Sequence, residues 1–190
     1  VELSRHQNNK GTYNIHVYIL TETSIYAFVA GTTYEVSGNS SEQNTENLTP
    51  IMGESTTTVE QMMRYYESTG NHYPAEALGK GGAPTLRDFC QIYYDEATAE
   101  GVKAEVAFAQ AMKESAWLKF GGIVKIEQFN FAGLGALDGN SQGQAASFPD
   151  VRTGIRAQIQ HLKAYASSGA LKNACVDQCI ENYGKRVTIC

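Results

Sequence analysis

The sequence lacks an excess of positive charge. Lysine and arginine total 15 residues against 20 aspartates and glutamates, which gives a formal net charge of −5 at pH 7. Proteins that bind nucleic acids use a positive field to neutralise phosphates, and this composition does not supply one. We therefore expect no nucleic-acid partner.

Long apolar runs are also missing. No stretch approaches the roughly 20 apolar residues that a membrane-spanning helix requires, so we expect no membrane span. The chain starts at Val1 rather than at a methionine, and we expect it to be a piece of a longer protein. A signal sequence upstream of Val1 stays an open alternative.

Cysteine is scarce, and its spacing fits no cofactor site. The four cysteines are Cys90, Cys175, Cys179 and Cys190, and none belongs to a Cys-x-x-Cys motif of the kind that holds zinc or acts in redox chemistry. Cys175 and Cys179 stand one helical turn apart, which is a poor geometry for a disulfide within an intact helix. We expect free thiols, no metal and no organic cofactor.

Two segments near the N-terminus have the pattern of β-strands. Residues 12–19 alternate between apolar and polar side chains, and residues 24–36 are rich in tyrosine, phenylalanine, valine and threonine. Too few strands are present to bury much surface alone. We expect residues 1–36 to be the last strands of a β-module, residues 37–53 to be a linker and residues 54–190 to form the main domain.

From residue 54 on, the apolar residues follow the helical period of 3.6, with glycine and proline near the helix ends. The predicted helices cover residues 54–70, 85–101, 103–119 and 151–166. An extended run at 123–131 and a glycine-rich loop at 133–147 predict a small β insertion before the last helix. This order predicts an α+β fold that is mainly α.

Glu114 is the residue most indicative of chemistry. On a helix, Trp117 and Leu118 would be its neighbours, so the carboxyl group would face an apolar surface near the helix C-terminus. Burial and the negative end of the helix dipole both favour the protonated form, and a neutral carboxylic acid can protonate a glycosidic oxygen. The alternative is a glutamate that reaches solvent or pairs with Lys113 or Lys119.

Three motifs follow one another in this region. They are Ala-Met-Lys-Glu-Ser-Ala-Trp-Leu at 111–118, Phe-Asn-Phe-Ala-Gly-Leu-Gly at 129–135 and Ser-Phe-Pro-Asp at 147–150, before the helix that carries Gln-His-Leu at 160–162. Together they resemble the motifs of the glucosaminidase domains of glycoside hydrolase family 73, with Ala116 where glycine is usual. The resemblance covers roughly residues 54–172.

The resemblance implies a lysozyme-like catalytic domain with Glu114 as general acid and a small β-lobe as the second wall of a saccharide groove. It implies cleavage of the β-1,4 bond between N-acetylglucosamine and N-acetylmuramic acid in peptidoglycan, with no metal or cofactor. Some relatives act as endo-β-N-acetylglucosaminidases on other glycans. The glycan strands of peptidoglycan are the expected partner, and the expected location is secreted or at the bacterial cell surface.

A second catalytic group remains open. Glu127 lies in the predicted extended run and Asp138 in the glycine-rich loop, and we rank them level as candidates to activate water or stabilise the oxocarbenium-like state. Asp150 ranks behind them because it precedes a helix in the position of an N-cap. Alternatively, the 2-acetamido group of the substrate assists, and no second carboxylate is needed.

Three further residues are candidates for contact with sugar. Asn130 and Phe131 are expected to line the groove, the amide bonding to an acetamido or hydroxyl group and the ring offering a flat apolar face. Trp117 is a third candidate, although packing over Glu114 is its more typical role. We interpret His161 as a structural residue.

The two ends of the chain bear on the expected location of the protein and on the alternative functions. After Asp177 the family usually continues with Asp-Pro-x-aromatic, a pattern absent here, where Tyr183 is the nearest substitute. Residues 11–18 look like the closing strands of repeat modules in surface proteins of Gram-positive bacteria. The alternatives to the glucosaminidase hypothesis are an N-acetylmuramidase or lytic transglycosylase on the same polymer, and a wall-binding module without catalysis.

Overall fold

The computed structural model describes residues 50–135 and 145–177, and the backbone of four short strands between residues 12 and 35. The chain divides into two compact units, Val1–Pro50 and Ile51–Cys190. Asp138, Tyr183, Cys179 and Cys190 therefore lie outside the described residues.

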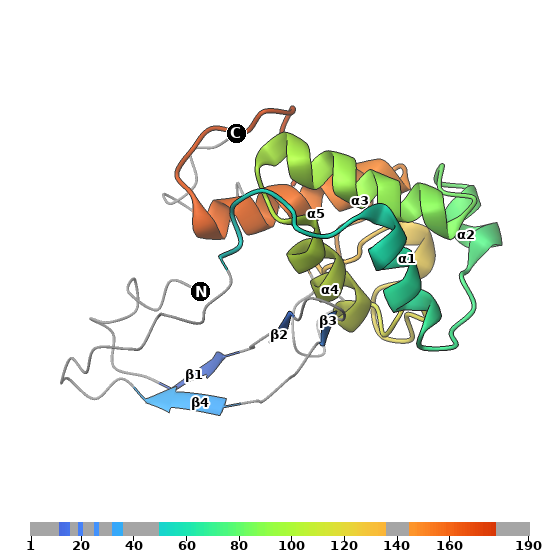
Figure 1. Cartoon of the computed structure of the whole chain (residues 1–190), viewed down its shortest axis with the longest axis horizontal. Coiled ribbons are helices and arrows are strands. Elements are labelled where there is room, and N and C mark those ends of the chain that lie inside the picture. The colour runs from blue at the N-terminus through green and yellow to red at the C-terminus, as the bar shows by residue number, and fades with distance from the viewer. Residues whose placement is uncertain are drawn as a thin grey trace. The chain divides into compact units, whose positions relative to one another are not determined.

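The first unit contains two small antiparallel pairings (Figure 1). Strand β1, Thr12–Ile15, pairs with β4, Thr32–Glu35, so that Tyr13 stands opposite Tyr34. Strand β2, Ile19–Leu20, pairs with β3, Ile25–Tyr26. The strand predicted over 12–19 contains β1 and the first residue of β2, and residues 16–18 lie outside the described residues. The resemblance to surface repeat modules stays a prediction.

The second unit is mainly helical, as the sequence predicts. Its elements are α1 at Val59–Glu67, α2 at Ala75–Gly79, α3 at Leu86–Glu100, α4 at Ala104–Glu114, the 3-10 helix η2 at Ile126–Gln128, and α5 at Val151–Ala166. Figure 1 shows α3 alongside α5, and α3 also packs against α1 and α4. None of the described helices is both long and apolar enough to cross a bilayer.

Local capping accounts for where the helices begin and end. Thr58 and Gln61 form a reciprocal capping box at the start of α1, and Thr85 and Asp88 form one at the start of α3. Helix α3 ends at Gly101, whose φ of 72° lies in the left-handed region that glycine adopts without strain. The predicted opening of this helix at Thr85 and its end at Gly101 are both confirmed.

The core is built around aromatic rings that α3 presents to its neighbours. Phe89 and Phe131 meet edge to face with ring centroids 5.2 Å apart, and Tyr93 and Phe108 do so at 5.5 Å. The hydroxyl of the fully buried Tyr93 donates to the Gln158 side chain of α5 at 2.7 Å. These contacts fix α3, α4 and α5 as one framework.

Residues before α1 hold the start of α4 in place. The Ser55 hydroxyl accepts a hydrogen bond from the backbone N–H of Ala104 at 2.8 Å, and the buried Glu105 carboxylate accepts one from the backbone N–H of Thr56 at 3.1 Å. The backbone N–H of Lys103 donates to Ile51. Residues 51–53 therefore belong to the helical unit, a little earlier than the boundary at 54 that the sequence indicates.

The prediction of an extended run at 123–131, and of a β-lobe built from it, is wrong, because no strand forms among these residues. Residues 126–128 form η2, in which the Phe129 N–H bonds to the Ile126 carbonyl at 3.1 Å. The Gln128 side chain closes back on the Lys125 N–H at 2.7 Å, and Phe129 has a left-handed φ of 49°. This local closure turns the chain where the apolar pattern indicates an extended run. Residues 136–144 lie outside the description.

The segment after α5 is held by side chains rather than by a helix. The Gln160 amide donates to the Ala174 carbonyl and accepts from the Val176 N–H, at 2.9 and 2.8 Å. Cys175, within this segment, is disulfide-bonded, whereas Cys90 is a buried free thiol. The expectation of free thiols is confirmed for Cys90 and wrong for Cys175, which lies beyond the end of α5 at Ala166 and not in a helix.

Candidate functional site

Glu114 is the last residue of α4 and is exposed. No hydrogen bond or ion pair reaches its carboxylate from the described part of the chain. The prediction that its side chain is buried against Trp117 and Leu118 is wrong. The helix ends at Glu114, so residues three and four positions ahead do not lie over it on a helical face. The structure thus leaves this carboxylate open to solvent and to a ligand.

A tight turn follows Glu114. The N–H of Ala116 bonds to the Lys113 carbonyl at 3.1 Å and the N–H of Trp117 to the Met112 carbonyl at 2.6 Å, which is the pattern of a Schellman motif. Ala116, Trp117 and Leu118 have φ values of 50°, 60° and 61°. The left-handed region favours glycine, so the geometry explains why glycine is usual where this chain has Ala116.

Ser115 clamps this turn from inside. The side chain is only 1% exposed, and its hydroxyl donates to the Ala111 carbonyl at 2.6 Å and accepts from the Leu118 N–H at 3.0 Å. The hydroxyl therefore bonds to backbone groups that precede and follow Glu114 in the chain. The Glu-Ser pair of the motif therefore combines an exposed carboxylate with a buried residue that holds its backbone.

Trp117 lies at the edge of the core and is half-buried. Its ring stands 5.1 Å from the ring of Tyr65 and 6.4 Å from that of Tyr66, both on α1. The Tyr66 hydroxyl, which donates to the His72 carbonyl at 3.0 Å, also lies 3.4 Å from the Trp117 carbonyl. Burial raises the pKa of Tyr66, so this hydroxyl stays protonated and remains a donor.

Asn130 and Phe131 are interior residues, which differs from the predicted contact with sugar. Phe131 is 1% exposed and packs among the core rings. The Asn130 amide donates to the carbonyls of Leu134 and Ala146 at 2.9 and 3.0 Å and accepts from the Leu134 N–H at 2.9 Å. Both polar atoms of its side chain are used to join Leu134 to Ala146, the described residues on either side of the segment that contains Asp138.

The other carboxylates considered from sequence fall into different environments. Glu127 is exposed on η2. Asp150 caps α5 by accepting the Thr153 N–H at 2.7 Å, as its position before a helix indicates. The interpretation of His161 as structural agrees with its contact to the buried Asp177, 2.6 Å from Nδ1 to Oδ2, which ties the segment after α5 to that helix.

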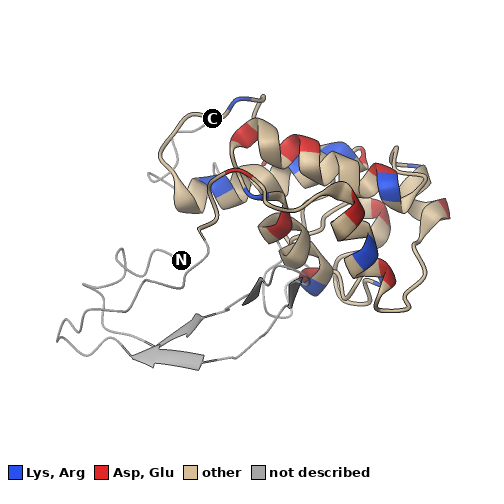
Figure 2. Ribbon diagram, in the orientation of Figure 1, with Lys and Arg blue, Asp and Glu red and all other residues tan. Residues whose placement is uncertain are grey.

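Two glutamates of α3, Glu96 and Glu100, are buried and paired with cations of α5. Figure 2 shows acidic (red) and basic (blue) segments side by side on the helices of the second unit rather than a surface of one sign. Burial alone would raise the pKa of Glu96, but hydrogen bonds from Arg156 and Arg152 outweigh it and hold that pKa below its ordinary value. Burial likewise opposes ionisation of Glu100, yet the Lys163 ammonium and two backbone N–H groups lower its pKa. These carboxylates are structural.

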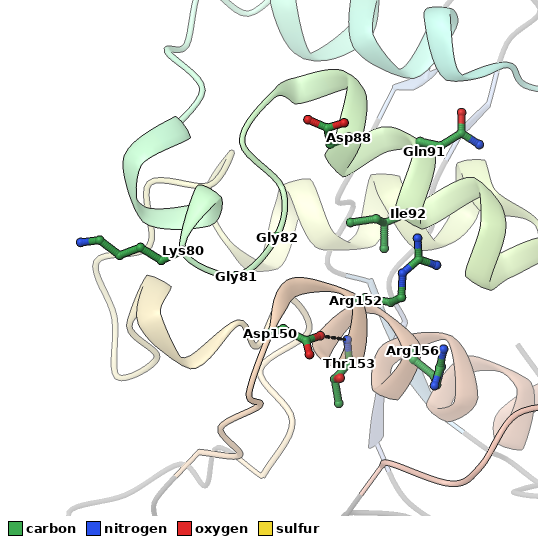
Figure 3. A pocket seen from close by; sticks show the side chains of 10 residues that line it. All are labelled: Lys80, Gly81, Gly82, Asp88, Gln91, Ile92, Asp150, Arg152, Thr153 and Arg156. Atoms are coloured by element: carbon green, nitrogen blue, oxygen red, sulfur yellow. Dashed lines mark hydrogen bonds between the residues drawn. The ribbon is translucent and has the colours of Figure 1, made fainter.

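A cavity of about 550 Å³ opens between the first turns of α3 and α5 and the Gly81–Gly82 turn (Figure 3). Of the carboxylates weighed above, it contains Asp150, whose oxygen already caps the helix, and neither Glu114 nor Glu127. Its Arg152 and Arg156 are bonded to Glu96. Within the described residues, no group of histidine, cysteine or acidic side chains is arranged to hold a metal ion.

Comparison with known sequences decides the family. A profile of the glucosaminidase family, described as mannosyl-glycoprotein endo-beta-N-acetylglucosaminidase, matches residues 90–187, just over half of the 190-residue chain. The chain belongs to the glucosaminidase family. This membership confirms the resemblance of its motifs to those of glucosaminidase domains. The match begins within α3, so α1 and α2 precede it.

One relative is an uncharacterised protein of Borreliella burgdorferi. It is 46% identical over 87 residues, which cover 46% of this glucosaminidase-family chain and 42% of the relative. The matched part therefore spans about two fifths of that protein's length. No solved structure matches the chain.

Two residues of this site were missed from the sequence. Ser115 stands beside Glu114 in the motif, and its polarity within an apolar helix was a signal that a local bond is needed there. Tyr65 is 52 positions away from Trp117, and neither periodicity nor spacing connects the two rings.

Proposed function

We propose that this chain cleaves the β-1,4 bond between N-acetylglucosamine and N-acetylmuramic acid in peptidoglycan, with Glu114 as the general acid. The observation that carries the proposal is the state of Glu114. Within the matched family region it ends a helix, it is exposed, and no hydrogen bond from the described residues occupies its carboxylate. The clamped turn after it fixes the backbone from which it acts.

The acid step requires a proton on the Glu114 carboxyl and a glycosidic oxygen within hydrogen-bond reach. A glycan that covers the exposed side chain removes water from it, and desolvation favours the neutral carboxylic acid. The acid then transfers its proton to the glycosidic oxygen as the bond to the anomeric carbon breaks, which leaves an oxocarbenium-like centre on the sugar.

A second group must stabilise that centre or activate water. Glu127 is exposed on η2 and remains a candidate. Asp138, which lies outside the described residues, remains level with it, and Asn130 joins Leu134 and Ala146 on either side of its segment. Assistance by the 2-acetamido group of the substrate is the third route. In this proposal Asn130 and Phe131, which are buried, position the backbone and do not contact sugar. Trp117, which is half-buried, is the predicted residue whose ring can contact sugar.

The setting that fits this activity is the bacterial cell wall. A hydrolase of peptidoglycan meets its substrate outside the membrane, so we extend the proposal to a secreted or surface-bound protein of the autolysin type. The predicted repeat-module strands at residues 1–36 suit such a setting.

The test is mass spectrometry of peptidoglycan fragments after digestion and borohydride reduction, which marks the new ends. The wild type should release fragments with reduced N-acetylglucosamine ends, and Glu114→Gln should release almost none. Glu76→Gln is the matched control, because Glu76 is 94% exposed on α2 and forms only a surface pair with Lys80. It should retain wild-type turnover.

Other outcomes identify the rivals. Reduced N-acetylmuramic acid ends would indicate a muramidase, and anhydro ends a lytic transglycosylase. Failure to release fragments from several kinds of wall, together with sedimentation of the protein on those walls, would indicate a binding module. Equal release by wild type and Glu114→Gln would remove Glu114 from the mechanism.

A further inference from the structure

We infer that Tyr65 of α1 contacts the glycan and forms, with Trp117, a two-ring platform on which a sugar stacks beside Glu114. This inference rests on the proposed function. It adds a binding residue from a part of the chain that precedes the matched family region.

The first support is the exposure and mutual contact of the two rings. Their centroids lie 5.1 Å apart with the planes inclined at 56°, and both side chains are half-buried. The neighbouring Tyr66 is 1% exposed, so it serves the core instead. The two adjoining, partly exposed rings are inclined to one another and so form an angled apolar surface, and a ring face is the partner that suits the C–H face of a pyranose.

The second support is the rigidity of both rings' backbones. Tyr65 lies between two anchors of α1, Met62 and Tyr66, which are 0% and 1% exposed. The backbone of Trp117 is held by two contacts: its N–H donates to the Met112 carbonyl, and the Trp117 carbonyl contacts the Tyr66 hydroxyl. A platform whose rings are already ordered loses little side-chain entropy when a ligand binds.

The third support is the distance to the acid. Three peptide units join Glu114 to Trp117, so their Cα atoms lie at most about 11 Å apart. The tight turn between them shortens this span, because the Trp117 N–H folds back onto the last turn of α4. This short span is what allows one glycan strand to contact the two rings and the Glu114 carboxyl together under this inference. The two rings would fix which sugar of the strand is presented to the acid.

Under this inference, the strained turn after Glu114 positions the Trp117 ring. Ala116, Trp117 and Leu118 adopt left-handed φ values that cost free energy for residues with a side chain. The turn brings the Trp117 ring against α1, where Tyr65 and Tyr66 receive it. Such strain persists only where surrounding contacts enforce it, and the α1 rings supply those contacts.

The test uses Trp117 as its reporter, since it is the single tryptophan of the chain. In the Glu114→Gln background, which blocks turnover, N-acetylglucosamine tetramer and soluble peptidoglycan fragments are titrated while the fluorescence is recorded. We expect a saturable change. Replacing Tyr65 with alanine should weaken the affinity about 3- to 10-fold, the range of one aromatic contact, and Tyr65→Phe should keep it within twofold.

Tyr94→Ala is the matched control, because Tyr94 is another half-buried tyrosine at the edge of the core, on α3. It should leave the affinity unchanged, and thermal unfolding establishes that each variant is folded. In the otherwise wild-type chain, Tyr65→Ala should raise KM for peptidoglycan and leave kcat nearly constant. A purely structural role would instead lower the thermal midpoint with the affinity of the folded fraction unchanged.

The outcomes separate this inference from the proposed function. Equal affinity in folded Tyr65→Ala and its parent, with turnover still dependent on Glu114, would overturn the platform and leave the general-acid proposal standing. A wild type that neither releases fragments nor responds in fluorescence would overturn both.

Discussion

The glutamates of α3 and the glutamate that ends α4 occupy opposite environments. Glu96 and Glu100 are each 3% exposed. The Glu96 carboxylate accepts a hydrogen bond from Arg156 of α5, and the Glu100 carboxylate accepts one from Lys163 of α5. Glu114 is exposed, and no described residue bonds to its carboxylate. The carboxylates of Glu96 and Glu100 thus stabilise the fold, whereas the Glu114 carboxylate has no bond from the described residues and is available for reaction, as a general acid must be.

The helix ends differ in the same way. Helix α3 stops at Gly101, whose left-handed φ costs little. Helix α4 stops before Ala116, which adopts φ of 50° with a side chain present. The strain is therefore located at the candidate site rather than at the structural end, as expected where backbone geometry serves a function.

The largest effect is expected for Glu100→Gln, which removes one of the buried structural carboxylates. The change leaves the Lys163 ammonium, 5% exposed, without its buried counter-charge. Breaking a buried pair in this way costs about 3–5 kcal/mol of unfolding free energy. Denaturant unfolding should show that loss, while Glu76→Gln on the exposed pair with Lys80 should change stability by less than about 0.5 kcal/mol. A loss below 1 kcal/mol for Glu100→Gln would contradict the assignment.

A smaller effect is expected for Asn130→Ala. The change removes the amide that joins Leu134 to Ala146, and buried groups left without partners cost about 1–3 kcal/mol. Hydrogen exchange at the Leu134 N–H should accelerate together with the loss of stability. Asn71→Ala is the control, because that amide bonds only to the exposed Thr69 hydroxyl. Unchanged exchange at Leu134 would refute the role of Asn130 as the tie of the loop.

Acid should weaken the α3–α5 pairs next. Both Glu96 and Glu100 have a pKa held below the ordinary 4.5 in the folded state, against the opposing effect of burial. Because a lowered folded pKa stabilises the ionised form, this contribution is complete above pH 4.5 and is lost as the pH falls below it. The unfolding free energy of the wild type should decline with acidification in that window. A Glu96→Gln variant should decline less steeply, and parallel curves would argue against the shift.

The smallest effect is expected for Ala116→Gly, which tests the strain at the site. Removing the side chain relieves a left-handed backbone, and the greater freedom of glycine in the unfolded chain offsets part of the gain. Stability should rise by less than about 1 kcal/mol, with turnover retained. Ala99→Gly, at an exposed helical position of α3, should instead lose about 0.5–1 kcal/mol. A loss of stability for Ala116→Gly would contradict the reading of the turn.

Local signals were sufficient for much of the helical framework. The apolar stripe that predicts the first helix consists of Val59, Met62, Met63 and Tyr66. The structure buries three of them in the core and leaves Met63 half-buried against it. The polar residue before the last helix correctly indicates Asp150 as its cap. These features depend on neighbours within one or two turns, which a single sequence displays directly.

The site itself was less accessible from sequence. The predicted burial of Glu114 depended on extending the helix to residue 119, whereas α4 ends at Glu114. Ala116 does not signal a helix end as glycine would, and the backbone bonds of the Schellman turn cannot be read from residue spacing. The contact between Tyr65 and Trp117 is set by the packing of α1, far away in the sequence. The extended run near residue 126 failed for a similar reason, since side-chain closure by Gln128 decided it.

The most direct measurement compares Glu114→Gln with Glu100→Gln for both turnover per folded molecule on peptidoglycan and thermal midpoint. Glu114→Gln should lose about 10²- to 10⁴-fold in turnover, the usual contribution of a general acid, and should keep its thermal midpoint because the Glu114 side chain is exposed. Glu100→Gln should lose midpoint and keep turnover in its folded fraction. Retention of more than a few per cent of turnover by folded Glu114→Gln would contradict the central claim.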